Sequence, residues 1–378
     1  MAMKIPVAKP FMGKEEAQAA YDTILTNWVT QGPRVAEFEE RFAAYVGAPH
    51  AVAVSNCTTA IHLALIVAGV KNGDEVICPS MSYIATANAI VHAGGTPVFA
   101  EVNPLTYNID PVHTESLITP RTKAILIVHQ IGLPADIDAF RLLCDRHGLA
   151  LIEDAACAAG SSYKGSRIGS HSDLVCFSFH PRKVITTGDG GMITTSRAAY
   201  ADRLRLLRQH GMSVNDRVRH ASTKVLFEEH VEIGYNFRMT DIQASVGIQQ
   251  LERLNYLVDE RRKIAHRYQD AFAQLDKVRL PVEPAGYFTN WQSYVLYLLP
   301  NTGLDRNDLM QAFLDRGIST RRGVMTSHRE PAYRDFVLRS ALPVSEDASD
   351  RSIVLPLYVP MSDAEIDYVI TNVLELLR

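Results

Sequence analysis

Between residues 50 and 200, short apolar runs alternate with stretches whose apolar positions recur at helical spacing. Continuously apolar strands that are separated by helices favour a parallel sheet covered on both faces, so we predict an α/β layer architecture. The apolar runs predict strands at residues 51–55, 75–78, 96–101, 124–128, 150–153 and 174–179. The stretches between them predict helices at residues 59–70, 85–93 and 136–147.

The pattern changes after about residue 240. Residues 240–274 have apolar residues at helical spacing among charges, which predicts one long amphipathic helix or two in series. A strand at 293–299 and helices at 304–316 and 363–377 follow. We therefore predict a large domain, residues 1–250, and a smaller α+β domain, residues 251–378, with the N-terminal segment 1–30 packing on the smaller one.

The composition of the 378 residues excludes several classes of protein. Lys and Arg total 38 and Asp and Glu total 42, a net charge of −4, which argues against a nucleic-acid-binding protein. No apolar run approaches the roughly 18 residues of a membrane helix, and the first residues lack the apolar core of a signal peptide, so we expect a cytoplasmic protein. The five cysteines have no CxxC spacing, which predicts reduced thiols and no metal site.

Two residues at the ends of predicted strands could carry chemistry. Asp154 directly follows the strand predicted at 150–153, and Lys183 comes soon after the strand predicted at 174–179. Ligands of open parallel sheets lie beyond the carboxyl ends of their strands. Taken alone, Asp154 could simply cap the next helix, and Lys183 could be a solvated surface cation. A lysine held in a cleft would have a lowered pKa and become nucleophilic. Together the two suit pyridoxal phosphate, whose aldehyde binds a lysine and whose ring nitrogen is kept protonated by a carboxylate.

The same cofactor needs a phosphate site and a flat contact for its ring. Residues 55–60, which include Thr58 and Thr59, join a predicted strand to a helix, so their backbone N–H groups and hydroxyls suit a phosphate, although an ordinary helix cap would look similar. Tyr83 follows the next strand and could stack on the ring, or could be a core aromatic. Ser178, near Lys183 in sequence, could supply another hydroxyl to the phosphate.

These pieces, in this order, resemble the DegT/DnrJ/EryC1/StrS family of sugar aminotransferases over nearly the whole chain. The resemblance implies a fold type I pyridoxal-phosphate transferase of the aspartate aminotransferase kind, with a large, mostly parallel sheet domain and a small α+β C-terminal domain. The motifs that carry it are TQGP at 30–33, the turn at 55–60, PSMSY at 79–83, VHQIGLPAD at 128–136, EDAA at 153–156, the segment 178–191, GYNFRMTDIQ at 234–243 and LPLY at 355–358.

The resemblance also implies a role for each matched residue. Lys183 becomes the Schiff-base lysine, Asp154 the partner of the ring nitrogen and Tyr83 the stacking residue. It further implies a homodimer with shared active sites, in which Asn236 reaches the neighbouring subunit's phosphate. The remaining positions are Thr58, Thr59 and Ser178 at the phosphate, Cys157 at the cofactor, and Thr30, Arg238, His328 and Arg329 toward the substrate.

Three residues depart from the family pattern. Cys157 stands where Gln or His usually touches the cofactor, and a thiol is a poorer hydrogen-bond partner. Cys57 stands where Gly is common, so we predict that this turn uses ordinary negative φ angles. Asp189 replaces the usual Glu of a GEGG motif, which keeps the charge and shortens its reach.

The resemblance implies transamination from L-glutamate to a nucleotide-linked keto-sugar, with a 4-keto-6-deoxy hexose preferred and pyridoxamine phosphate as the intermediate form. A keto-cyclitol acceptor and a non-catalytic sensor that binds pyridoxal phosphate remain alternatives. A dehydratase of the same family would have histidine in place of Lys183. A Rossmann dehydrogenase is disfavoured because no GxGxxG follows the first strand.

Overall fold

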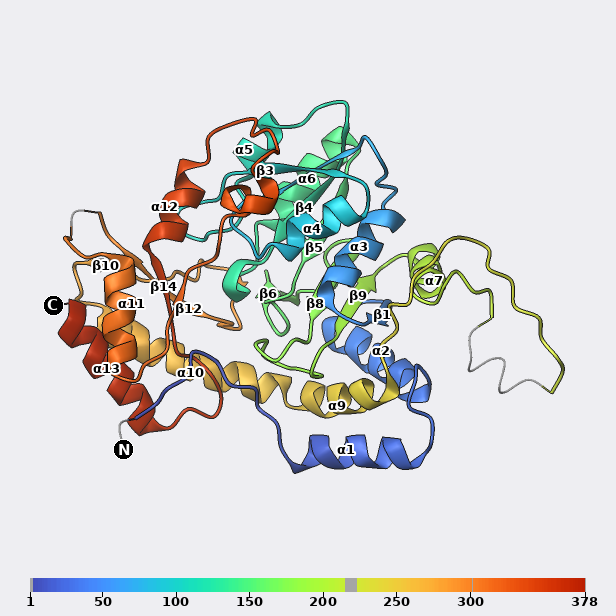
Figure 1. The fold of residues 1–378 in the computed structure, drawn as a ribbon, viewed down its shortest axis with the longest axis horizontal. Helices are drawn as coiled ribbons and strands as arrows, with labels where there is room; N and C mark the ends of the chain where they lie inside the picture. Colours follow the sequence, from blue (N-terminus) through green and yellow to red (C-terminus); the bar gives the residue numbers. More distant parts are fainter. Residues whose placement is uncertain (1–2, 215–222, 301, 378) are drawn as a thin grey trace.

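The computed structural model describes residues 3–214, 223–300 and 302–377, and its centre is a seven-stranded sheet (Figure 1). All of its neighbouring strands are parallel except β9, which is antiparallel to the strands on both of its sides. The mostly parallel α/β prediction is therefore confirmed, and β9 is the strand that it missed. In spatial order the strands are β1 (His50–Val54), β9 (Gly191–Thr195), β8 (Leu174–Ser178), β5 (Ala150–Asp154), β4 (Thr122–Val128), β2 (Glu75–Pro79) and β3 (Thr96–Ala100).

Helices cover this sheet on both faces. One core contains Phe38, Phe42, Phe140 and Phe177, which are all buried, and it packs beneath α2 (Pro33–Val46), α6 (Ile137–His147) and the later helix α9. The other core lies beneath α3 (Cys57–Val67), α4 (Ala85–His92) and α7 (Ala198–Leu207). Because both faces of the sheet are buried away from water, apolar side chains are favoured at successive positions of each strand, which is the pattern seen in the sequence. The short helix α5 (Pro111–Ser116) precedes β4.

Two helices in series lead from the sheet to the rest of the chain. α9 (Asp241–Glu252) and α10 (Leu254–Phe272) are separated only at Arg253, which confirms the second of the two predicted alternatives. Helix α1 (Lys14–Leu25) lies against α9, on the side away from the sheet (Figure 1). Asp241, the first residue of α9, accepts hydrogen bonds from the backbone N–H groups of Gly32 (2.7 Å) and Val35 (3.0 Å) and so caps the start of α2.

The C-terminal part has a core of its own around Phe272, Tyr294 and Phe313. The N-terminal segment joins it, because the N–H of Ile5 donates to the carbonyl of Gly317 (2.8 Å) and Ile5 itself is buried there. Both chain ends lie beside this part (Figure 1). Its antiparallel sheet has the order β10 (Val278–Arg279), β12 (Tyr294–Leu298), β14 (Ser352–Leu355) and β13 (Arg321–Arg322), with helices α11 (Arg306–Asp315), α12 (Pro343–Arg351) and α13 (Asp363–Leu377).

Several contacts tie the C-terminal part to the large one, and two of them lie at β3 and β6 (Ser162–Tyr163). Glu101, just beyond β3, accepts the N–H groups of Val344 (2.9 Å) and Ser345 (2.7 Å) at the start of α12. A second, three-stranded sheet joins β11 (Tyr287–Phe288) to β6 and β7 (Ser166–Arg167). Three short 3₁₀ turns, η1 (Gln130–Gly132), η2 (Ser327–Arg329) and η3 (Pro331–Tyr333), complete the fold.

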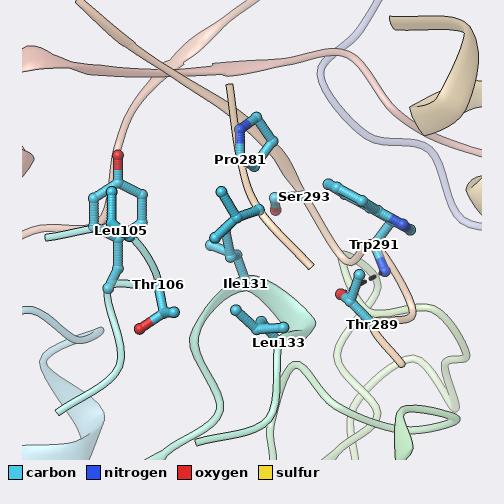
Figure 2. A pocket seen from close by; sticks show the side chains of 10 residues that line it. Leu105, Thr106, Ile131, Leu133, Pro281, Thr289, Trp291 and Ser293 are labelled. Carbon is cyan, nitrogen blue, oxygen red and sulfur yellow. Dashed lines mark hydrogen bonds between the residues drawn. The ribbon is translucent and has the colours of Figure 1, made fainter. Parts of the chain in front are cut away.

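Figure 2 shows a cavity at the contact between the two parts, with Ile131 and Leu133 on one side and Pro281 and Trp291 on the other. Its volume of about 10 Å³ is scarcely enough for one water molecule. The small volume of the cavity shows that the two parts pack tightly here, and the cavity is too small to be a ligand site. No helix in the described ranges is long and apolar enough to cross a membrane.

Candidate active site

Asp154 lies at the carboxyl end of β5, buried beneath the loops that follow the central strands. Its Oδ1 accepts the N–H of Ala156 (3.0 Å), and its Oδ2 accepts the hydroxyl of Thr86 (2.9 Å). Burial raises the pKa of the Asp154 carboxyl, and these two hydrogen bonds and the nearby Lys183 only partly oppose that effect. A buried carboxylate of this kind gains stability from a positive charge placed beside it.

Lys183 lies in the loop after β8, and its Nζ is 3.2 Å from the sulfur of Cys157. Burial on its own lowers the pKa of Lys183, but Cys157 and Asp154 outweigh it, so the net shift of the pKa is upward. The lowered pKa expected from the sequence is therefore wrong for this arrangement, because the hydrogen bond to Cys157 and the nearby Asp154 accompany the burial.

The turn before α3 offers hydrogen-bond donors beside these residues. Asn56 caps the helix by accepting the N–H of Thr59 (2.9 Å), which leaves the N–H groups of Cys57 and Thr58 without a partner in the described ranges. Cys57 is absent from the described positions with positive φ, so the prediction of ordinary negative φ at this turn is confirmed. Gly191 lies directly under the turn, where a Cβ would come within 2.5 Å of the Asn56 carbonyl carbon.

The other two predicted cofactor residues border the same region. Ser178 ends β8 with its side chain buried, and its hydroxyl accepts the N–H of His180 (3.3 Å). Tyr83 is 69% exposed, so its ring is accessible to a ligand.

A carboxylate and a lysine at strand ends, together with a helix N-terminus, are the parts expected of a pyridoxal-phosphate site. The sequence profile of the DegT/DnrJ/EryC1/StrS aminotransferase family matches residues 10–374. The chain belongs to this family. It is thus a pyridoxal-phosphate-dependent aminotransferase with the α/β fold of that group.

Individual relatives agree with the family assignment. The chain is 40% identical over 378 residues to the spore coat polysaccharide biosynthesis protein SpsC of Bacillus subtilis, covering 99% of this chain and 97% of SpsC. Two similar solved structures are TlmJ from Streptoalloteichus hindustanus and DesV from S. venezuelae, each with a TM-score of 0.91, 33% identity and 99% coverage of both chains. PseC of Helicobacter pylori, involved in pseudoaminic acid biosynthesis, has a TM-score of 0.93 at 26% identity, with 99% coverage of both chains.

The residues of the aminotransferase fit the cofactor. The free N–H groups of Cys57 and Thr58 at the start of α3 suit its phosphate, and the buried carboxyl of Asp154 suits its protonated ring nitrogen. When bound, pyridoxal phosphate supplies an electron sink that stabilises a carbanion at the carbon bearing the donor's amino group.

The residues predicted to face the substrate are placed less uniformly. The side chain of His328 is buried, with one ring nitrogen hydrogen-bonded to the Ser80 hydroxyl and the other to Glu346 (3.0 Å). Arg329 instead forms an exposed ion pair with Asp350 (2.9 Å). The geometry therefore suits His328 to positioning the loop that carries Ser80 and Tyr83.

The three remaining predicted residues lie on segments that meet near α2 and α3. The carbonyl of Thr30 accepts the N–H of Asp241 (3.1 Å), and Asn236 forms a bridge with Gln209 while its side chain is exposed. Phe237 lies between Asn236 and Arg238, and its carbonyl accepts the N–H of Ser55 (2.8 Å). This hydrogen bond places the segment 236–238 beside the turn before α3.

The structure adds residues that the sequence analysis missed. The hydroxyl of Thr86 donates to Asp154. The available sequence signal was the spacing of Thr86, four residues after Ser82 on the helix that follows Tyr83, where the two hydroxyls meet. His129 is fully buried, accepts the N–H of Ala135 at Nδ1 (3.0 Å) and therefore donates from Nε2 to Glu153 (2.8 Å). Nothing in the linear sequence pairs His129 with Glu153, since β4 and β5 become neighbours only in the sheet.

Two arginines were also missed, and one of them, Arg321, interacts electrostatically with Tyr83. Arg182 and Arg321 influence each other electrostatically, and in the described ranges neither forms an ion pair with an acid. Burial, followed by the positive charges of Arg182 and Arg322, lowers the pKa of Arg321, while Tyr83 acts in the opposite direction. Two like charges held close together favour an anionic ligand.

Proposed function

We propose that this aminotransferase transfers the amino group of L-glutamate to a nucleotide-linked keto-sugar, with a 4-keto-6-deoxy hexose as the preferred acceptor. The observation that carries the proposal is the cluster of the buried Asp154 with the partly buried Cys157 and Lys183, next to a helix N-terminus with free N–H groups. Such a cluster provides an acid–base lysine and a fixed negative charge at one small site.

In the proposed reaction, the Lys183 amine would hold the cofactor at rest and, once the amino donor has replaced it there, would act as a base. It removes the proton from the Cα of the donor and delivers it to the C4′ carbon of the cofactor. In the second half it returns a proton to the carbon that was the sugar ketone. Asp154 holds positive charge at the ring nitrogen throughout, and Tyr83 covers the ring.

An anionic, sugar-like acceptor is supported by two observations. Arg182 and Arg321 bring two positive charges together, with Arg321 also close to Tyr83, and a diphosphate would neutralise them. SpsC is a polysaccharide biosynthesis protein and PseC takes part in pseudoaminic acid biosynthesis, so amino-sugar formation is the role that we propose for this chain.

The acceptor is tested with a panel of GDP-, UDP- and dTDP-linked 3-keto and 4-keto sugars, each assayed for glutamate-dependent amination. We expect a 4-keto-6-deoxy member to react and the same sugar without its nucleotide to react poorly. Amination of a keto-cyclitol alone would contradict the nucleotide-sugar proposal. If none of the amino donors tested changes the cofactor absorbance, the result would indicate the sensor alternative.

We also propose that two subunits share each active site. Bulky apolar side chains in the segment 225–233 are highly exposed, with Phe227 at 88% and Ile233 at 89%, and this segment extends from the body beyond α7 (Figure 1). Exposed apolar side chains of this size mark an interaction surface. The partner that we propose is a second copy, toward which Asn236 would extend the phosphate site. Further exposed apolar residues are Tyr21, Ile24, Leu25, Val225 and Val231.

Sedimentation measures this association directly. We expect the native chain to sediment as a dimer, and Phe227→Asp with Ile233→Asp to shift it toward monomer with reduced cofactor retention. The control is Val337→Asp, since Val337 is equally exposed (91%) but lies in the loop before α12. A dimer unaffected by the double substitution would contradict the proposed surface.

A further inference from the structure

Cys157 differs from the other four cysteines of the chain. Cys57, Cys78, Cys144 and Cys176 are buried, whereas Cys157 is partly exposed. Burial raises the pKa of each of these four thiols and so keeps them in the unreactive protonated form. Cys157 is thus the thiol that a small oxidant in solution can reach.

The contact between Cys157 and Lys183 is built into the fold. Asn290, which is fully buried, donates from Nδ2 to the carbonyl of Cys157 (2.8 Å). Two residues later, Gln292 donates from Nε2 to the carbonyl of Arg182 (2.6 Å), the residue before Lys183. One short segment between β11 and β12 therefore fixes the backbone at both members of the pair.

The segment itself has little freedom. The Oδ1 of Asn290 accepts the N–H of Gln292 (2.9 Å), and the neighbouring Trp291 packs into the contact shown in Figure 2. Because both backbones are held, the 3.2 Å separation between the Lys183 nitrogen and the Cys157 sulfur is a property of the site. A nucleophilic nitrogen is thus held next to an oxidisable sulfur.

We propose that Cys157 is a peroxide-sensitive modification site whose oxidation captures the catalytic lysine. Hydrogen peroxide oxidises the thiol to a sulfenic acid and is itself reduced, with one oxygen atom transferred to sulfur and one molecule of water released. The Lys183 ammonium then loses a proton to the solvent, and the resulting amine attacks that sulfur. An N–S bond forms, the S–O bond breaks, and the leaving hydroxide takes a second proton from the nitrogen to depart as water. The product is a sulfenamide, which two equivalents of an external thiol reduce back to the free thiol and amine.

The cross-link competes with catalysis, because it occupies the nitrogen that must bind the cofactor. Lys183 is free only after the amino donor has taken its place on the cofactor. The proposal therefore rests on the role proposed above for Lys183, and it predicts that the amino donor sensitises the enzyme to peroxide.

The test treats holoenzyme with hydrogen peroxide, with and without L-glutamate, followed by peptide mass spectrometry. We expect a Cys157–Lys183 cross-linked peptide, lighter by two hydrogen atoms than its two parts, mainly in the glutamate sample. Addition of 2-oxoglutarate should restore the starting absorbance only after dithiothreitol has been added. Cys157→Ser should form no cross-link, and Cys57 and Cys176 are internal controls.

Oxidation of Cys157 to sulfinic acid without the cross-link would overturn the proposal, as would attachment of a different lysine. If the absorbance does not respond to glutamate before peroxide is added, the proposed donor is wrong. The same mass spectrum, taken on protein freed of cofactor by dialysis, then tests the cross-link independently. Absence of the cross-linked peptide in that sample would also overturn the proposal.

Discussion

Lys183→Ala is expected to abolish aminotransfer while leaving the fold intact. Alanine removes both the amine that anchors the cofactor and the base that moves a proton between the donor's Cα and the cofactor's C4′ carbon. A positioned acid–base group contributes about 10²–10⁴-fold to a rate, and loss of the anchor adds to this. The measurement is the rate of glutamate-dependent amination together with the visible absorbance of the purified variant.

The spectrum separates this role from a structural one. The variant should bind pyridoxal phosphate but lack the absorbance of the lysine-bound form, and a small primary amine in the buffer should restore part of the activity. Lys164→Ala is the matched control, since Lys164 is an exposed lysine paired with Asp138 (2.5 Å), and surface pairs of this kind contribute little to stability. Normal turnover by Lys183→Ala would contradict the assignment of Lys183.

The central sheet could be predicted from the sequence because burial on both faces leaves a direct signal. Six of its seven strands coincide with continuous apolar runs, and the helices between them have amphipathic spacing. β9 was missed because it follows a glycine-rich turn and ends in two threonines. It is also the antiparallel strand of the sheet, so the alternation of strands and helices gives no sign of it.

The candidate site divides in the same way between local and distant signals. Asp154, Thr58 and Lys183 each follow a strand that the sequence predicts, so their place at one edge of the sheet could be expected. The hydrogen bond from Asn290 to the carbonyl of Cys157 could not be expected, because Asn290 is 133 residues away in the chain. The predicted direction of the Lys183 pKa shift was wrong for a related reason, since the shift depends on the Cys157 sulfur and on Asp154 as well as on burial.

Asp154→Asn should separate activity from stability. Asparagine keeps the shape of the side chain but cannot hold a positive charge on the cofactor's ring nitrogen, so the carbanion at the donor's Cα loses its stabilisation. Loss of one fixed electrostatic partner in an active site costs about 10²–10³ in rate. The amination rate of Asp154→Asn should fall by that order, with Asp138→Asn as the exposed control.

The stability of the cofactor-free protein should move in the opposite direction. Burial raises the pKa of Asp154 in the fold, so its stabilising contribution is present below the ordinary aspartate pKa of about 4 and is lost as the pH rises through the raised value. At neutral pH the ionised carboxylate therefore costs stability, and Asp154→Asn should melt at the same temperature as the native chain or higher. The difference should vanish in acid, which a series of melting curves across pH would measure.

A fixed charge on the cofactor distinguishes the proposed role from simple misfolding of the site. Pyridoxal phosphate methylated at the ring nitrogen carries a permanent positive charge and needs no carboxylate to maintain it. Loading Asp154→Asn with this analogue should recover part of the lost rate, because the electron sink is then independent of residue 154. Equal rates with the methylated and ordinary cofactors would mean that Asp154 acts through the packing of Thr86 and Ala156, to which it is hydrogen-bonded, and not through charge.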